Sequence, residues 1–321
     1  MSVEVFQIAG ISFTRFGLGC ALALLLYLAV IRLLTRKQAE YGSFITLALL
    51  TVPLCWLTSR LLFVAVDFIG HFLQASVYLD EYGDPALALR FWEGGYSLMG
   101  ALLGALLALH LAEALTGKHT VFRDAAAIAF PLAIALERLA EYGTGVGEGQ
   151  PVELQWAIDT GLCIESEGYY YWPVCLLEAL AMLVLFVLMV IRRIRQSDRV
   201  PGDKLRSFLA IFGLVSIVLE TLRSDYHMEV HFVKAQMVIA LLLVLGCMLV
   251  WSRRMKGDTR MELGCWGLTI AAVAGAVIAE FGVDRWDSKL LAYGLLLICV
   301  LLIGWMAFSL RDWSTVKRKN F

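Results

Sequence analysis

The stretch SKLLAYGLLLICVLLIGWMAFS at 288–309 decides the fold class, because no charged side chain follows Lys289 within it. A helix rises about 1.5 Å per residue, so a run of about 20 apolar residues spans the hydrocarbon core of a bilayer. The sequence therefore predicts an all-α, polytopic membrane bundle of about nine transmembrane helices. The other eight candidate spans lie upstream, at about 12–34, 43–66, 94–115, 125–141, 173–191, 207–222, 233–251 and 264–282.

The composition agrees with a membrane protein and argues against a nucleic-acid partner. Hydrophobic residues make up 60% of the chain and charged residues 17%, with a formal net charge of -1. Soluble proteins average roughly 45–50% apolar and about 25% charged residues. The seven cysteines form no CxxC pair and no metal-type cluster, so we expect no metal site. Cys163 and Cys175 lie in or beside one polar loop, and the sequence leaves open whether a disulfide joins them.

Basic residues gather in alternate connections between the predicted spans. The connections at 32–37, 118–123, 192–206 and 253–260, with the tail beyond 309, hold most of the 27 Lys and Arg residues. The opposite connections are acidic. Because cytoplasmic loops of membrane proteins are enriched in Lys and Arg, we expect the basic side to be cytoplasmic. An odd number of spans then places the N-terminus outside and the C-terminus inside.

Five ionisable residues lie near the predicted outer ends of three spans, and they mark a candidate site. Such residues cost several kcal/mol in a bilayer unless they are paired or hydrated. Two arginines there would suit a phosphate, because a guanidinium group binds phosphate oxygens in a fork. The neighbouring carboxylates would orient the arginines or accept a proton. The five residues are Arg138, Glu141, Glu178, Glu220 and Arg223.

Four of these five residues also have a purely structural interpretation. Arg138 could extend its side chain to the headgroup layer. Glu220 and Arg223 are three residues apart, as in an ordinary ion pair on one helix. Glu178 could satisfy a neighbouring backbone group. The gathering of all five on one side of the membrane favours a site over these separate roles.

Two glycine-rich stretches have different interpretations. GGYSLMGALLGALLA at 94–108 has small residues at close spacing, which predicts tight packing of one helix on another. Its first two residues, Gly94 and Gly95, predict a turn just before the span. GTGVGEG at 143–149 follows a helix rather than preceding one, and it fits no dinucleotide or P-loop motif. We therefore expect a flexible loop there and no nucleotide or other cofactor.

Taken in order, blocks of this sequence resemble the bacterial prolipoprotein diacylglyceryl transferase family. The resemblance covers about residues 10–253, or seven spans. It divides the chain into a transferase-like membrane body at 1–253 and a two-helix extension with a basic cytoplasmic tail at 254–321. The blocks are RFGLGCALA (15–23), SRLLFVAVDF (59–68), PALALRFWEGGYSLMGALLGALL (85–107), RDAAAIAFPLAIALERLAEYGTGVGEG (123–149), WPVCLLEAL (172–180), LETLRSD (219–225) and AQMVIALLLVLG (235–246).

The resemblance implies a reaction and a location. The family moves a diacylglyceryl group from phosphatidylglycerol to the cysteine thiol of a lipoprotein signal segment, and glycerol phosphate leaves. The implied partners are an anionic phospholipid and that signal segment, in the bacterial cytoplasmic membrane. From the residues themselves, we take Glu141 and Glu220 as the candidate catalytic residues. The implied substrate-binding residues are Arg138, Arg223, Glu178, Arg60, Gly94 and Gly95.

Four positions depart from the family pattern. Met99 stands where the family has histidine, Glu141 where it has asparagine, Ser216 where it has arginine, and Phe16 where it has tyrosine. Methionine cannot accept a proton, and serine cannot neutralise a phosphate. We therefore expect the standard transfer to be weak or absent, or directed to an altered acceptor. The alternatives are a non-catalytic lipid- or partner-binding protein of the same fold and, third, a small-solute transporter, which inverted repeats would favour.

Overall fold

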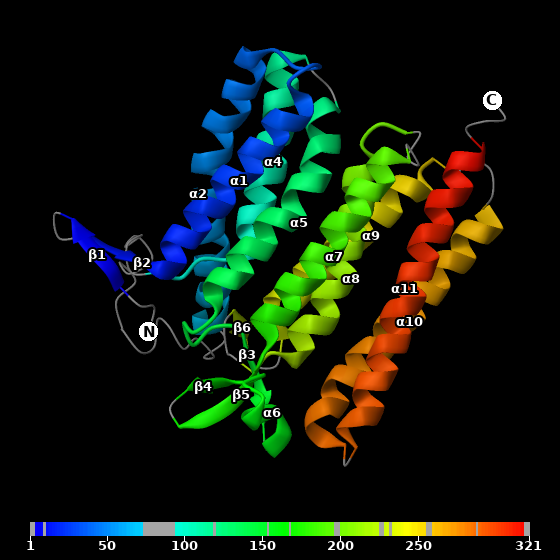
Figure 1. Ribbon diagram of the computed structural model, residues 1–321. Helices are drawn as coiled ribbons and strands as arrows, with labels where there is room; N and C mark the ends of the chain where they lie inside the picture. Colours follow the sequence, from blue (N-terminus) through cyan, green and yellow to red (C-terminus); the bar gives the residue numbers. More distant parts are fainter. Residues whose placement is uncertain are drawn as a thin grey trace.

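The computed structural model describes residues 4–8, 11–72, 94–117, 120–152, 154–166, 168–195, 200–224, 228–230, 233–254, 259–286 and 288–317. Long helices make up most of these residues and pack as a bundle, which confirms the predicted all-α polytopic architecture (Figure 1). The long helices are α1 (Arg15–Thr35), α2 (Tyr41–Phe72), α4 (Leu98–Thr116), α5 (Val121–Glu141), α7 (Val174–Ile194), α8 (Asp203–Leu222), α9 (Ala235–Ser252), α10 (Thr259–Arg285) and α11 (Lys289–Lys317).

Within the described part of the chain, eight helices are long and apolar enough to cross a membrane, against the nine that the sequence suggested. The exception is α5, the fourth predicted span. Its ionisable residues, among them Asp124, Glu137 and Arg138, lower its hydropathy. The helix nevertheless lies inside the bundle, against α1, α7 and α8, and most of its residues are buried. Its polar groups therefore meet protein rather than lipid, which lowers the cost of their burial.

The first span begins later than predicted. Ile11–Thr14 forms strand β2, which pairs with β1 (Glu4–Ile8), and α1 begins only at Arg15. The side-chain oxygen of Thr14 accepts a hydrogen bond of 3.1 Å from the backbone N–H of Gly17, as an N-cap residue does. The second span is longer than predicted, because α2 continues to Phe72. Residues 73–93, between α2 and the turn before α4, lie outside the described residues.

Small strands cover the end of the bundle that is lower in Figure 1. An antiparallel sheet has the order β3 (Glu148–Pro151), β5 (Tyr169–Pro173), β4 (Ile164–Ser166), and the short helix α6 (Gln155–Asp159) lies between β3 and β4 in the chain. A second hairpin pairs β6 (Glu229–Val230) with β7 (Val233–Lys234). Helix α11 ends at the opposite, upper end. The polar cluster described in the next section lies at the same end as the sheet, because β5 leads directly into α7 and Gly149 of β3 pairs with Arg223 after α8.

The small residues of α4 allow it to lie directly against α2, as predicted. A side-chain carbon added at Gly104 would lie 2.5 Å from the carbonyl oxygen of Leu54, and one at Gly100 would lie 2.6 Å from that of Thr58. The Thr58 hydroxyl donates a hydrogen bond of 2.7 Å to the carbonyl oxygen of Gly100. Backbone contact at this distance leaves no room for alanine at either glycine.

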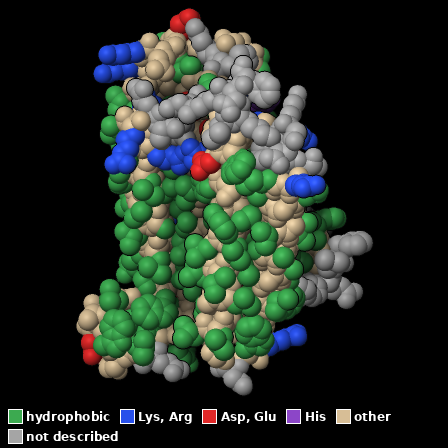
Figure 2. Space-filling model, turned by 90° about the vertical axis from the view of Figure 1, so that its right-hand side faces the viewer, with side chains coloured by type: hydrophobic (Ala, Val, Ile, Leu, Met, Phe, Trp, Pro, Cys, Tyr) green, Lys and Arg blue, Asp and Glu red, His purple; other side chains and the backbone are tan. Residues whose placement is uncertain are grey.

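Helices α10 and α11 form a hairpin that packs on α8 and α9. The ring of Phe308 in α11 lies 6.1 Å from that of Trp251 in α9. Figure 2 shows the outer face of the bundle on the side of this hairpin. Hydrophobic side chains form a broad band on that face, with Lys and Arg along its upper border. Exposed side chains such as Ile270, Leu290 and Trp305 belong to this hairpin. An apolar band with a basic border is what contact with a bilayer requires.

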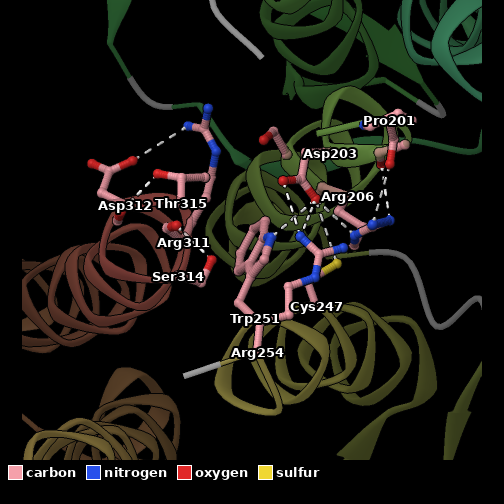
Figure 3. Close-up of polar contacts among 12 residues, drawn as sticks. Pro201, Asp203, Arg206, Cys247, Trp251, Arg254, Arg311, Asp312, Ser314 and Thr315 are labelled. Carbon is pink, nitrogen blue, oxygen red and sulfur yellow. Dashed lines mark hydrogen bonds and ion pairs between the residues drawn. The ribbon is translucent and has the colours of Figure 1, made fainter. Parts of the chain in front are cut away.

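A buried carboxylate fixes the beginning of α8 to the end of α9 (Figure 3). Asp203 is 1% exposed and accepts hydrogen bonds from Arg206 Nε at 3.0 Å, Arg254 Nη1 at 2.9 Å and Trp251 Nε1 at 3.4 Å. Bonds to a charged group of this kind are stronger than neutral ones. They hold α8 at one end, and the candidate site lies at the other.

Candidate functional site

Arg138 occupies the last turn of α5 and contacts carboxylates of two helices. Its Nη1 donates to Glu141 Oε1 at 2.5 Å, and its Nε lies 3.0 Å from Glu178 Oε2 in α7. The residue is 5% exposed, so these contacts replace the water that the guanidinium group loses. Its side chain therefore points into the bundle, which excludes the interpretation that it extends to the headgroup layer.

Arg223 follows the last residue of α8 and shares the same carboxylates. Its Nη1 donates to Glu178 Oε2 at 3.4 Å and lies 3.9 Å from Glu141 Oε2. Arg223 is 2% exposed and Glu178 is 7% exposed. One oxygen of Glu178 thus lies between the two guanidinium groups and joins three helices. The expected convergence of the two arginines beside carboxylates is present in the structure.

Two carboxylate oxygens in this group accept no hydrogen bond within the described residues. They are Oε2 of Glu141 and Oε2 of Glu137, and both are buried. Glu137 Oε2 lies 3.5 Å from Arg138 Nε. Such an oxygen can receive a proton or bind water or a polar ligand group. Glu137 was not selected from the sequence, although the same signal, an ionisable residue inside a predicted span, was available for it.

The last turn of α8 is bound by a lysine that sequence reasoning also missed. Lys234 Nζ donates to the carbonyl oxygens of Glu220 and Arg223, at 2.9 Å and 2.8 Å. The last carbonyl groups of a helix lack the usual partner four residues ahead, and a nearby lysine can bind them. Here Lys234 binds the carbonyl of Arg223 and shares that of Glu220 with the backbone N–H of Arg223. Glu220 itself is 5% exposed. A basic residue on the acidic side of the bundle was the available signal for Lys234.

The glycine-rich segment after α5 packs against these residues instead of standing free as a loop. Gly147 has a φ of +79°, and a side-chain carbon there would lie 2.8 Å from Cys175 Cβ and 3.1 Å from Glu141 Oε2. Its carbonyl oxygen accepts a bond of 3.0 Å from the backbone N–H of Cys175. Gly149 forms a backbone bridge with Arg223. No disulfide joins Cys163 to Cys175, because both are free thiols.

Arg60 and the two glycines before α4 form a second group. The guanidinium group of Arg60 donates to the carbonyl oxygens of Gly94 and, at 3.0 Å, of Gly95. Both glycines have positive φ values, +87° and +74°, so the predicted turn is present. Arg60 is 1% exposed, and its two hydrogen bonds hold the backbone turn just before α4. These contacts place the three residues together.

A small cavity lies beside the ion pairs of Arg138, and one of the departures from the family pattern lines it. Its volume is about 10 Å³, close to the space of a single water molecule. Ser216 lines it together with Arg138 and Glu178, and Leu98 at the start of α4 is another lining residue. Met99, beside Leu98, is 2% exposed and belongs to the hydrophobic core. The serine therefore shares this cavity with Arg138 and Glu178.

Comparison with known sequences shows which protein family this chain resembles. The sequence model of prolipoprotein diacylglyceryl transferase matches residues 3–252. Curated proteins similar to this chain carry the name phosphatidylglycerol–prolipoprotein diacylglyceryl transferase. The protein from Leifsonia xyli is 31% identical over 60% of this chain and 60% of its own length, and that from Fervidobacterium nodosum is 26% identical over 57% and 63%. The protein from Listeria innocua is 24% identical over 78% of this chain and 89% of its own length.

The chain thus spans about 60% of the length of the first two relatives and more of the third. All three relatives are bacterial, and the described residues of this chain include eight helices that are long and apolar enough to cross a membrane. Together they identify a multi-pass protein of the bacterial cytoplasmic membrane. The match over residues 3–252 takes in both groups of candidate residues and all the long helices from α1 to α9. The chain belongs to the prolipoprotein diacylglyceryl transferase family.

Proposed function

We propose that this protein transfers a diacylglyceryl group from phosphatidylglycerol to the cysteine thiol of a lipoprotein signal segment, at a reduced rate. The observation that carries the proposal is the buried pair of Arg138 and Arg223, which share Glu178 where α5, α7 and α8 meet. Guanidinium groups in a desolvated site suit the phosphate of an anionic lipid. The family membership and the names of the relatives support this choice of lipid and acceptor.

The reaction requires a proton acceptor beside the anion site. The thiol sulfur forms a bond to the glycerol carbon of the lipid, the bond from that carbon to the phosphate oxygen breaks, and glycerol phosphate leaves with the electron pair. The thiol proton must pass to a base. Oε2 of Glu141 suits this role, because it is buried, lies 3.9 Å from Arg223 and accepts no hydrogen bond among the described residues. Glu220, at the end of α8, is the second candidate.

A second candidate function is lipid binding without transfer, and the charge balance of the cluster favours it. Two guanidinium groups contact three carboxylates, those of Glu137, Glu141 and Glu178, so the arginines are already paired. A phosphate must compete with these carboxylates. Removal of one catalytic acid or base typically lowers a rate about 10²–10⁴-fold. Met99 and Ser216 in place of histidine and arginine therefore predict slow turnover.

A transfer assay with the purified protein distinguishes the two functions. The protein is incubated with phosphatidylglycerol labelled in its acyl chains and with a signal peptide that contains one cysteine. We expect a slow mass increase of one diacylglyceryl group, absent with a Cys→Ser peptide and with the Glu141→Gln variant. Retention of labelled lipid without any modified peptide would establish the binding function instead. Neither retention nor transfer would contradict both functions.

A further inference from the structure

The α10–α11 hairpin lies beyond residues 3–252, which match the family, yet it contacts the body next to the candidate site. Helix α10 carries one contacting carboxylate near each end. Glu262, near its start, accepts a hydrogen bond from the hydroxyl of Ser252 in α9. Glu280, near its end, accepts a bond of 2.9 Å from the hydroxyl of Thr221 in α8. The second contact is one residue from Glu220 and two from Arg223.

A carboxylate at position 280 is costly unless it has a partner. Its neighbours in the sequence, VIAEFGV at 277–283, are otherwise apolar, and the helix spans the membrane. Thr221 is 4% exposed, and its hydroxyl also lies 3.0 Å from the carbonyl oxygen of Ile217. The hydroxyl has only one proton, and a carboxylate is the stronger acceptor. The contact with Glu280 is therefore the stronger of the two.

This contact and Lys234 hold the last turn of α8 through different elements. Lys234, at the end of β7, binds the carbonyl oxygens of Glu220 and Arg223. Glu280 binds the side chain of Thr221 between them, from α10. Arg223 Nη1 lies 3.4 Å from Glu178 Oε2, near the limit of a hydrogen bond. A small displacement of this turn would separate Arg223 from Glu178.

We infer that Glu280 is a positioning residue of the candidate site, through which the C-terminal hairpin fixes the last turn of α8 and hence Arg223. The hairpin, which lies outside the matched residues 3–252, thereby takes part in the site. The expected effect of Glu280 on lipid binding rests on the proposed function. The expected effect of Glu280 on the position of the last turn of α8 is independent of that function.

The first test is hydrogen–deuterium exchange of residues 217–224 in the full-length protein. The backbone N–H of Arg223 donates to the carbonyl oxygen of Glu220 at 3.2 Å, so its exchange reports on this turn. Glu280→Ala should accelerate exchange here about tenfold, and Glu280→Gln, which retains an acceptor oxygen, much less. Glu262→Ala, at the other end of the same helix, is the matched control and should leave this segment unchanged. Equal exchange in wild type and Glu280→Ala would overturn the inference.

The second test measures phosphatidylglycerol retained by the same purified variants. Loss of a hydrogen bond to a charged group corresponds to about tenfold in affinity. We expect Glu280→Ala to retain about tenfold less lipid, Thr221→Val to do the same, and the double variant to lose no more, because the two residues act through one contact. Additive losses would contradict the shared contact. A wild-type protein without lipid would count against the proposed function, while the exchange experiment still decides the position of α8.

Discussion

Glu178 is the carboxylate that the two buried arginines, Arg138 and Arg223, share. It is 7% exposed, and one of its oxygens contacts both Arg138 and Arg223. The sequence identified all three residues, because an ionisable side chain in an apolar run is costly and therefore conspicuous. It did not identify which of them pair, since pairing depends on how α5, α7 and α8 are rotated about their axes.

Glu178→Ala should be strongly destabilising. The substitution removes the contacts of Glu178 with Arg138 at 3.0 Å and with Arg223 at 3.4 Å, and loss of one partner of a buried ion pair typically costs about 3–5 kcal/mol. We expect a clearly lower midpoint of thermal unfolding in detergent. Glu165→Ala, which removes an exposed carboxylate of β4, is the control and should lie within about 0.5 kcal/mol of wild type. Similar midpoints for the two variants would show that Glu178 is not part of a buried pair.

Restoring arginine at position 216 should not by itself restore activity. The cavity beside Ser216 measures about 10 Å³, far less than the added side chain requires. Overpacking of this kind costs about 1–3 kcal/mol. We expect Ser216→Arg to lower the unfolding midpoint and to leave transfer slow, whereas Ser216→Ala should change neither. Transfer at the rate of a standard family member in the single variant would mean that the cavity opens more than its geometry suggests. Met99→His together with Ser216→Arg is the next combination to assay.

At the scale of elements, the apolar runs of the sequence predicted the long helices. They did not predict the short strands or the packing of the glycine-rich segment. Strands of two to five residues have no hydrophobic periodicity that a sequence could display. The contact of Gly147 with Cys175 and Glu141 joins the end of α5 to the start of α7. The sequence predicted a flexible loop at these glycines. The residues that the segment packs against are apparent only in the structure.

Gly147→Ala should disturb the candidate site more than Gly143→Ala does. Both glycines have positive φ values, so the backbone strain of an added side chain is similar. At Gly147 the new carbon would also lie 2.8 Å from Cys175 Cβ, whereas at Gly143 it meets open space. We expect Gly147→Ala to lose more bound lipid and more transfer activity than the control. Equal losses in the two variants would show that only the φ value matters.

At the scale of the molecule, the division between α1–α9 and the α10–α11 hairpin remains a proposal about how the chain is organised. The sequence predicted spans at all nine long helices. Among the described residues, eight of these helices are long and apolar enough to cross a membrane, and α5 is not. The polar residues of α5 are tolerable because neighbouring helices enclose them. The orientation in the membrane is also a prediction, which rests on the placement of Lys and Arg. In the structure, α11 ends at the end of the bundle opposite the sheet (Figure 1).

Topology reporters test that orientation. A fusion after Phe321 and an insertion at Gly161, in the connection between α6 and β4, should report opposite sides of the membrane. The C-terminal fusion should report the cytoplasm. Gly161 suits an insertion because the space beside it is open. Reporters on the same side would contradict the predicted arrangement of helices across the bilayer.

The central claim is that the buried arginines bind an anionic phospholipid, and mass spectrometry of lipids retained by the purified protein tests it most directly. The matched variants are Arg138→Ala and Arg36→Ala, the second an exposed arginine after α1. We predict that wild type and Arg36→Ala retain phosphatidylglycerol and that Arg138→Ala retains at least tenfold less, since a charge-assisted contact of about 1.5–3 kcal/mol is lost. Equal retention by Arg138→Ala and wild type, with both proteins folded, would contradict the claim.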